Sequence, residues 1–193
     1  MTLALVALVF MAPLFLVIAV VMRLTDPGPI FFVHMRIGRF GAPFPCFKFR
    51  SMVCDAEQRL AAILAADPVK RRIWERDQKL EDDPRVTPIG NFLRKSSLDE
   101  LPQLFNVLRG DMSLVGPRPI TAGEVVRYGR RFASYSSVRP GITGLWQVCG
   151  RSSVSYQRRV ALDVAYVRRR SMSLYGKIVL GTVPAVLMGR GSC

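Results

Sequence analysis

The stretch LALVALVFMAPLFLVIAVVM, residues 3 to 22, decides how the rest of the chain is placed. It carries no charge, and about 20 apolar residues are enough to cross a bilayer as a helix. Pro13 lies near its middle, where it cannot donate an N–H and its ring clashes with the preceding turn. Two topologies follow: a kinked helix that crosses the bilayer, or a helix broken at Pro13 that dips into one leaflet and returns.

The flanks of this stretch argue against a cleaved signal peptide. No basic residue precedes it, and no small-x-small cleavage site follows it. It ends at Arg23 and runs into the turn-rich exit Thr25-Asp26-Pro27-Gly28-Pro29. Basic residues dominate the chain after Met22, so we expect the bulk of the protein on the cytoplasmic side of the membrane.

Composition restricts the chemistry. The 193 residues carry 28 Lys and Arg against 14 Asp and Glu, a net charge of +14, which points to nucleic acid, anionic lipid headgroups or phosphorylated substrates. The single histidine, His34, lies in an apolar run and is expected to pack in a strand. A His cluster for a metal is therefore excluded, and carboxylates, Lys and Arg are left to carry any catalysis. The four cysteines show no CxxC spacing and are expected to be reduced.

The remaining pattern predicts one compact α+β domain, residues 25–193, behind a membrane helix, residues 1–24. Two strand-like runs flank a turn-rich segment and predict a small β-hairpin packed with several helices. The stretch from Ile178 to Met188 is apolar but too short to span, so we expect it to pack on the domain or lie at the interface. The expected strands are 30–33 and 44–49, and helical patterns cover 52–66, 70–79, part of 91–108, and 154–166.

The stretch from Arg94 to Pro102 holds two adjacent carboxylates, Asp99 and Glu100. One interpretation is structural: Ser97-x-x-Glu100 has the spacing of a capping box, and acidic residues favour a helix N-terminus. Pro102 conflicts with a cap at Ser97, because it would stand where a helical N–H is already needed. The other interpretation is catalytic, because a carboxylate can act as a nucleophile on phosphorus.

Cations surround the acidic pair in the sequence. Lys48 ends a predicted strand, Arg94 precedes the acids, and Arg118 stands between Pro117 and Pro119. A carboxylate attacks a diphosphate only when cations or Mg²⁺ neutralise the phosphate oxygens. Two prolines stiffen the backbone that presents the guanidinium of Arg118, and a fixed guanidinium matches phosphate bidentately.

Ordered segments along nearly the whole chain resemble the bacterial sugar transferase family, the monotopic polyprenyl-phosphate phosphoglycosyl transferases. The C-terminal segment Thr182-Val-Pro-Ala-Val with Arg190-Gly-Ser resembles the exopolysaccharide-initiating galactosyl-phosphate transferases within it. The segments are DPGPIFF from Asp26, RIGR from Arg36, FKFRSM from Phe47, DPRVTPIG from Asp83, LRKSSLDELPQ from Leu93, GDMSLVGPRP from Gly110 and RPGITGLWQ from Arg139.

The resemblance implies an activity. The enzyme would move hexose 1-phosphate from a UDP-hexose, with galactose favoured, to undecaprenyl phosphate at the cytoplasmic face of the bacterial inner membrane. Asp99 would be the nucleophile and a ligand of Mg²⁺, would release UMP and would hold the phosphosugar covalently. Glu100 would assist. The membrane helix would be re-entrant, with its break at Pro13.

Further contacts follow from the same resemblance. Lys48, Arg94 and Arg118 would hold phosphates, while Pro117, Pro119 and Gln147 would contact the nucleotide. Membrane lipids are expected partners and nucleic acid is not. Two other functions stay open on the residues alone: a membrane-tethered nucleic-acid binder, suggested by the charge of +14, and a non-catalytic membrane scaffold.

Overall fold

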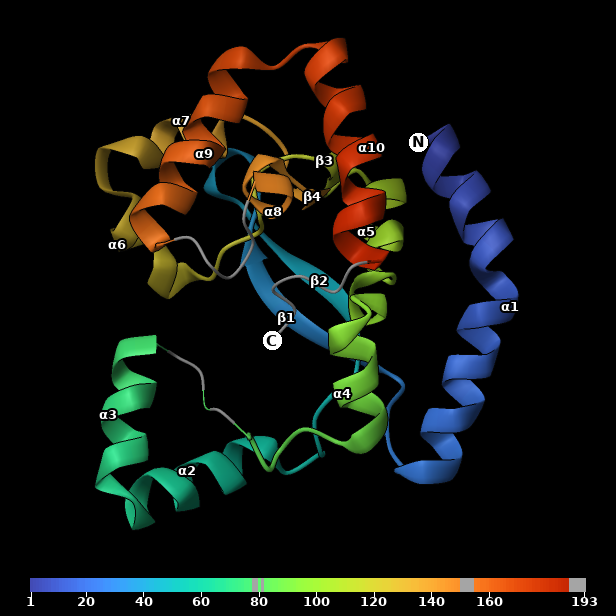
Figure 1. Cartoon of the computed structure of the whole chain (residues 1–193), viewed down its shortest axis with the longest axis vertical. Coiled ribbons are helices and arrows are strands. Elements are labelled where there is room, and N and C mark those ends of the chain that lie inside the picture. Colours follow the sequence, from blue (N-terminus) through green and yellow to red (C-terminus); the bar gives the residue numbers. More distant parts are fainter. Residues whose placement is uncertain (78–79, 81, 150–154, 188–193) are drawn as a thin grey trace.

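The computed structural model of the chain describes residues 1–77, 80, 82–149 and 155–187. These residues form a mixed helical and β structure in which helices predominate, as the sequence predicted (Figure 1). The longer elements are α1 (Thr2–Thr25), β1 (Phe31–Ile37), β2 (Pro43–Phe49), α2 (Ala56–Ala66), α3 (Pro68–Asp77), α4 (Pro88–Lys95), α5 (Gln103–Arg109), α9 (Tyr156–Arg169) and α10 (Met172–Leu187). The shorter ones are η1 (Arg39–Gly41), η2 (Leu98–Glu100), β3 (Ser113–Val115), η3 (Ala122–Glu124), α6 (Val125–Tyr128), η4 (Gly129–Arg131), α7 (Phe132–Ser136), β4 (Gly141–Thr143) and α8 (Leu145–Cys149).

Helix α1 runs along one side of the molecule (Figure 1). It is continuous through Pro13, so the break that the sequence analysis expected there is absent. Proline removes one hydrogen bond of the helical ladder, and a long apolar helix tolerates that loss when the other bonds hold the turn. Within the described residues, α1 is the one helix long and apolar enough to cross a membrane.

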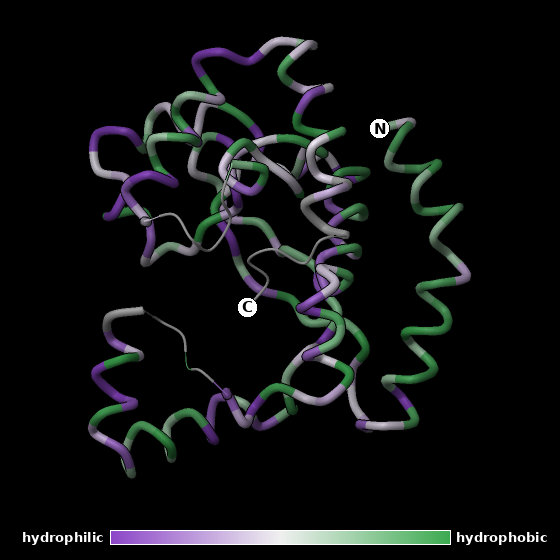
Figure 2. Tube along the Cα trace, viewed as in Figure 1, coloured by the Kyte–Doolittle hydropathy of each residue, from purple (hydrophilic) through white to green (hydrophobic). Residues whose placement is uncertain are grey.

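The two faces of α1 have different surroundings. Its inner face packs into the core, where Ile18 and Met22 are buried with Phe49 of the hairpin and Leu93 of α4. Its outer face is apolar and exposed along the whole length of the helix (Figure 2). An exposed apolar surface of this extent is typical of contact with a membrane or another protein.

Strands β1 and β2 form the expected hairpin, with each strand longer than predicted. They pair antiparallel, with Phe32 opposite Lys48 and Arg36 opposite Phe44. Side chains alternate between the two faces of a strand, so the even-numbered residues Arg36 and Lys48 share one face. His34 lies between them in β1, as the sequence analysis expected of a strand residue.

The helical pattern in 91–108 resolves into two helices, α4 and α5, joined by the 3₁₀ turn η2. Ser97 adopts a left-handed conformation, φ 58°, and its side chain makes no capping hydrogen bond, so the suggested capping box does not form. Pro102 takes the N-cap position of α5, where no helical N–H is required of it. Because α5 begins at Gln103, Pro102 does not stand inside a helix that is capped at Ser97.

A second, parallel β pair joins segments that are distant in the sequence. Ser113 of β3 pairs with Gly141 of β4, and Val115 pairs with Thr143. The backbones approach so closely that a Cβ on Gly116 would lie 2.6 Å from the carbonyl oxygen of Arg139. This contact places the loop after β3 beside the segment that leads into α8.

The remaining helices lie around the two β pairs. Helices α2 and α3 form an arm that extends away from the body (Figure 1). Helix α2 begins at Ala56 rather than at Met52, because Met52 forms a β-bridge with Val86. The C-terminal apolar stretch belongs to α10, and the expected packing on the domain is confirmed at Ile178, which is buried with Val115. Met188 lies outside the described residues, as does Val154 before α9.

Candidate active site

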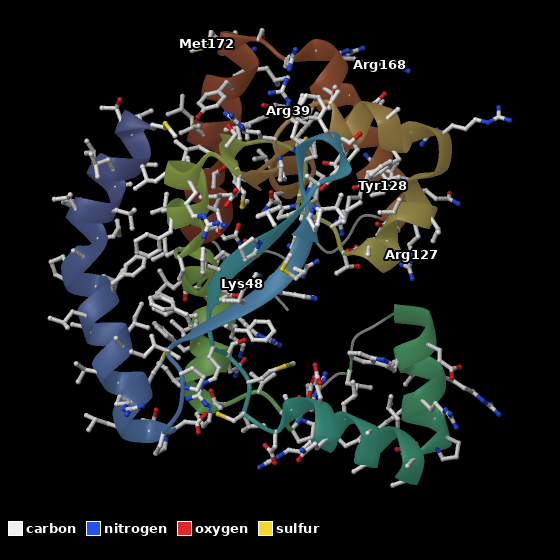
Figure 3. The ribbon with its side chains drawn as sticks, turned by 180° about the vertical axis from the view of Figure 1, so that it is seen from behind. Arg39, Lys48, Arg127, Tyr128, Arg168 and Met172 are labelled. Atoms are coloured by element: carbon white, nitrogen blue, oxygen red, sulfur yellow. The ribbon has the colours of Figure 1, made fainter. Side chains whose placement is uncertain are left out.

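Lys48 lies on β2 in the middle of the molecule, next to the turn that holds the two carboxylates (Figure 3). Its ammonium nitrogen Nζ donates a hydrogen bond to Oε1 of Glu100 at 2.7 Å. The same nitrogen lies 3.6 Å from Oδ2 of Asp99. One cation therefore contacts both acids, and the predicted grouping of Lys48, Asp99 and Glu100 is present in the structure.

The backbone of η2 brings the two carboxylates together. Ser97 reverses the chain after α4, and the left-handed conformation of such a residue costs on the order of 1–3 kcal/mol. Asp99 and Glu100 then follow in the 3₁₀ turn, just ahead of α5. Asp99 is only 8% exposed. The surrounding packing must offset the backbone strain, and strained residues of this kind often occur at functional sites.

Asn106 fixes α5 beside the free edge of β2. Its side chain accepts a hydrogen bond from the backbone N–H of Phe47 at 3.0 Å and donates one to the carbonyl of Pro45 at 2.7 Å. It also donates to Asp111 at 3.2 Å. These bonds pair the backbone groups on either side of Cys46 and set the distance between Lys48 and the turn before α5.

Arg118 enters the site from the loop after β3. Its Nη1 lies 3.7 Å from Oε1 of Glu100, and its guanidinium is 5.8 Å from the centre of the Trp146 ring. The buried Tyr135 hydroxyl donates to the carbonyls of Arg118 and Ile37 at 3.2 and 3.0 Å. The loop is thus held to the end of β1, and the structure places Arg118 beside Glu100.

Arg94 comes to the site from α4 but makes a different contact. Its Nε donates to the hydroxyl of Ser51 at 2.9 Å. Burial lowers the pKa of Arg94, and the negative charge of Asp99 acts against that decrease. Arg94 therefore contributes a positive field to Asp99, while the ion pair with Asp99 in the described part of the chain is made by Lys48.

The two acids have opposite pKa shifts. Burial raises the pKa of Asp99, and the adjacent Glu100 carboxylate adds to the increase, against the opposing fields of Lys48, Arg94 and Arg118. Burial alone would also raise the pKa of Glu100, but Lys48 and Arg118 outweigh it and hold that pKa at about 2. Separated pKa values in a carboxylate pair are typical of sites in which the two groups have different roles.

A small pocket opens in front of Lys48, Glu100 and Arg118. Gln147 and Pro119, two of the predicted nucleotide contacts, belong to its wall, whereas Pro117 is buried outside it. Its full lining is Arg36, Cys46, Lys48, Glu100, Gln103, Arg118, Pro119, Ile142 and Gln147. Five predicted residues line this pocket, whereas Asp99 and Arg94 are not part of its lining; the five are Lys48, Glu100, Arg118, Pro119 and Gln147.

Sequence reasoning missed Arg36 and Gln103 as site residues. Burial lowers the pKa of Arg36, with a further decrease from Arg118. The guanidinium donates to the carbonyl of Pro119 at 3.5 Å and pairs with Glu124 at the same distance. A signal was available for Arg36, because the antiparallel register of the hairpin places it on the same face as Lys48.

A polar cluster around Arg159 of α9 was also missed. Arg159 stacks on the rings of Trp146 and Tyr156, 4.9 and 5.1 Å from their centres. Its Nε and Nη2, with Trp146 Nε1 and Gln147 Oε1, are buried without a hydrogen-bond partner in the described structure. Nη2 of Arg159 lies 3.7 Å from Oε1 of Glu124, with which it forms an ion pair. Buried polar groups without partners are costly, so the other three atoms are candidates for contact with a polar ligand.

The metal-binding capacity of the site is limited to the acidic pair. Within the described residues, no group of three or more His, Cys, Asp or Glu side chains is arranged to hold a metal. Mg²⁺ that is bound with substrate phosphates commonly takes only one or two carboxylates from the protein, so Asp99 with Glu100 suits it. In this structure Lys48 holds the position between them.

The arrangement suits chemistry on a phosphate. Asp99 in its ionised form is available as a nucleophile, and Lys48, Arg94 and Arg118 provide positive charge that favours this form. Guanidinium groups bind phosphate oxygens and stabilise charge that develops in phosphoryl transfer. The pocket is lined by Lys48 and Arg118 and by the amide of Gln147, whose oxygen has no hydrogen-bond partner among the described residues.

Comparisons with known proteins agree with this chemistry. The family model described as bacterial sugar transferase matches residues 1–189. The chain is 46% identical over 189 residues to the exopolysaccharide production protein ExoY of Sinorhizobium fredii, covering 98% of this chain and 84% of that protein.

Two further relatives carry names that state a reaction. The undecaprenyl-phosphate galactose phosphotransferase of Salmonella typhimurium is 51% identical over 167 residues, covering 86% of this chain and 35% of that protein. The UDP-glucose:undecaprenyl-phosphate glucose-1-phosphate transferase of Caulobacter vibrioides is 42% identical over 184 residues, covering 91% of this chain and 63% of that protein. The chain thus spans about a third of the length of the Salmonella relative.

Proposed function

The chain belongs to the bacterial sugar transferase family, and from this premise we propose that it moves a hexose 1-phosphate from a UDP-hexose onto undecaprenyl phosphate, releasing UMP. Galactose is the proposed sugar, because ExoY-type and galactose-phosphate transferases are among its relatives and its C-terminal segment resembles the same group. The reaction would start the assembly of an exopolysaccharide on its lipid carrier.

The observation that carries this proposal is the contact of Lys48 with both carboxylates beside Arg118. An isolated carboxylate is repelled by a diphosphate. Here four cationic side chains, Lys48, Arg94, Arg118 and Arg36, lie on or around the pocket next to Asp99. They reduce the repulsion and leave the carboxylate free to attack.

In the proposed reaction, an oxygen of Asp99 attacks the β-phosphorus of the UDP-hexose. The bond from that phosphorus to the bridging oxygen breaks, and UMP leaves with the electron pair. An oxygen of undecaprenyl phosphate then attacks the phosphorus held on Asp99, which frees the carboxylate. Splitting one displacement into two in this way is nucleophilic catalysis.

The other side chains have distinct proposed roles. Lys48 and Arg118 hold the diphosphate oxygens, and Arg94 adds a positive field from behind Asp99. Glu100, with its pKa at about 2, stays ionised and orients Lys48 and Arg118. Asp99, with Glu100 beside it, would hold Mg²⁺, and the ion would supply further neutralisation of negative charge.

The test of this function is the release of UMP by membranes that contain the full chain. UDP-galactose, UDP-glucose and UDP-N-acetylhexoses would be compared, each with and without undecaprenyl phosphate and Mg²⁺. The proposal predicts release that depends on the lipid and is fastest with UDP-galactose. A failure with every sugar would contradict the function, whereas a preference for another sugar would change only the substrate.

A further inference from the structure

A second hollow lies beside Phe47, the neighbour of Lys48 in β2. Successive side chains of a strand point to opposite faces, so Phe47 points away from the face that carries Lys48. The hollow measures about 470 Å³, within the range of roughly 300–1,000 Å³ that is usual for ligand pockets. It is lined by Phe31, Phe47, Phe105, Leu108 and Arg109, which we call the α5 groove.

The walls of the α5 groove are almost entirely apolar and are exposed. Phe31 and Phe105 are 43% and 40% exposed, although both are large aromatic residues. Phe105 packs edge-on against Phe15 of α1, with ring centres 6.0 Å apart. The apolar wall of the groove is therefore continuous with α1, the helix expected to lie in the membrane.

One cationic side chain, that of Arg109, lies at the end of the groove. Arg109 is the last residue of α5, and its guanidinium lies 5.7 Å from the centre of the Phe47 ring. Its Nε pairs with Asp111 at 3.2 Å, while 53% of the side chain remains exposed. A groove for hydrocarbon that ends in an exposed guanidinium matches a molecule with an apolar chain and an anionic head.

We propose that the α5 groove binds an anionic membrane glycerophospholipid, with one acyl chain among the three Phe rings and the phosphate on Arg109. The proposal rests on the location of α1 in the membrane and does not depend on the transferase reaction. The bound lipid would fill the space between the hairpin and α5, and it would stabilise the folded state increasingly as the lipid concentration rises above its dissociation constant.

The geometry distinguishes this lipid from the acceptor. The acceptor phosphate must reach Asp99, which precedes the N-terminus of α5, whereas Arg109 lies at the C-terminus of that helix. A helix of seven residues is about 10 Å long. A phosphate seated on Arg109 is therefore too far from Asp99 to react, so the phosphates of the two lipids occupy different positions.

The test is direct binding of fluorescent phosphatidylglycerol to the full chain in detergent, with phosphatidylcholine and undecaprenyl phosphate as unlabelled competitors and without UDP-sugar. One cation next to an anionic lipid contributes about 1 kcal/mol, so phosphatidylglycerol should bind about fivefold more tightly than phosphatidylcholine. Arg109→Gln should remove this preference, and Phe105→Gln should weaken both lipids. Arg130→Gln, at an exposed arginine away from the groove, is the matched control.

Three results would overturn the proposal. Equal binding of the two phospholipids by the unaltered chain would exclude the head-group contact. Unchanged binding by Arg109→Gln and Phe105→Gln, with both variants folded by circular dichroism, would place the lipid elsewhere. Displacement by undecaprenyl phosphate as effective as that by phosphatidylglycerol, with a raised KM for that lipid in Arg109→Gln, would make the groove the acceptor site. Because no sugar is present, an inactive enzyme would leave the binding result unchanged.

Discussion

Lys48 is the residue on which the charge balance of the site depends. It contacts Glu100 and Asp99 at 2.7 and 3.6 Å and lowers the pKa of both. Asp99 nevertheless has a raised pKa, because burial outweighs the nearby cations. A nucleophilic Asp99 must be ionised, so the rate of UMP release should fall on acidification at a higher pH than an ordinary Asp would give.

Replacing Lys48 tests this balance. Lys48→Gln removes a positive charge that favours the ionised form of Asp99, so the pKa of Asp99 should rise further. We expect the acidic limb of the pH–rate profile to move to higher pH, in addition to a lower maximal rate. The measurement is the pH dependence of UMP release, with Lys95→Gln, an exposed neighbour of the site on α4, as the control. An acidic limb at the original pH in Lys48→Gln would contradict the role of Lys48.

The sequence was enough to predict the reacting side chains, but it was not enough to predict the side chains packed around them. Asp99, Glu100, Lys48 and Arg118 were predicted from residue type and resemblance, and the structure brings them together. Arg159 could not be predicted in this way. Its place depends on how α9 packs against α8, and an arginine in a helix of many basic residues has no local signal of burial.

A close backbone contact at Gly90 holds helix α4 against the segment that contains Ser51. A Cβ on Gly90 would lie 2.0 Å from the carbonyl oxygen of Ser51, the residue whose hydroxyl binds Arg94. The contact involves backbone, so it cannot be relieved by moving a flexible side chain. The close approach of Gly90 and Ser51 sets the position of Arg94 relative to Asp99.

Gly90→Ala should therefore destabilise the protein by about 1–3 kcal/mol, the usual cost of overpacking, and reduce the rate of UMP release. Thermal unfolding and the UMP assay would measure the two effects. Gly123→Ala is the matched control, because nothing lies within 4 Å of the position of its Cβ. Equal stability of the two variants would show that α4 does not need the close approach.

Helix α9 contains a buried acid, Asp163, which is 1% exposed. Its Oδ2 accepts a hydrogen bond from the Tyr128 hydroxyl at 2.7 Å, while Oδ1 has no partner in the described structure. Burial raises the pKa of Asp163 to about 6, against opposing effects of Tyr128 and Arg159. The folded state thus binds a proton between the ordinary pKa of Asp and pH 6, where the unfolded state does not.

The raised pKa of Asp163 makes the stability of the folded protein depend on pH. The contribution of Asp163 to stability is fully present below its unfolded pKa and is lost as the pH rises through about 6, with a total on the order of 3 kcal/mol. Asp163→Asn resembles the protonated acid, so its stability should depend less on pH between 4 and 7 and exceed that of the unaltered chain at pH 7. Denaturant unfolding at several pH values would measure this, and a pH slope identical to that of the unaltered chain would contradict it.

Sequence patterns predicted some of the strands and helices correctly and missed others. Two strand-like runs and the turn before Phe44 predicted the hairpin, because each strand has a local signal. The pairing of β3 with β4 had none, since both strands are three residues long and 25 positions separate Val115 from Gly141. The expected break at Pro13 failed for a different reason: proline alone does not show whether the rest of an apolar helix holds the turn.

For the whole molecule, the distribution of apolar surface and charge is the main feature. The outer face of α1 is apolar over most of its length, and apart from Arg23 near its end the charged residues, with a net charge of +13 of the total +14, belong to the rest of the chain (Figure 2). An apolar helix on one side of a basic domain matches the interface between hydrocarbon and anionic headgroups. The inner membrane and its cytoplasmic face are accordingly the proposed location.

A charge on the outer face of α1 should weaken this attachment. Phe10 is 76% exposed, and Phe10→Arg places a cation where hydrocarbon is expected, at a cost of about 2.5–3.5 kcal/mol. Fractionation in high salt should move part of this variant from the membrane to the soluble fraction. Val126→Arg, at an equally exposed residue of α6, should stay in the membrane fraction. Retention of both variants would place the membrane contact elsewhere.

In the proposed reaction Asp99 carries the phosphosugar between donor and acceptor. The most direct measurement is the intact mass of the purified chain after incubation with UDP-galactose and Mg²⁺ in the absence of any lipid acceptor. The account predicts an added mass of one hexose phosphate, which disappears on addition of undecaprenyl phosphate and never forms in Asp99→Asn. The same added mass in Asp99→Asn would contradict the claim and assign the nucleophile to another residue.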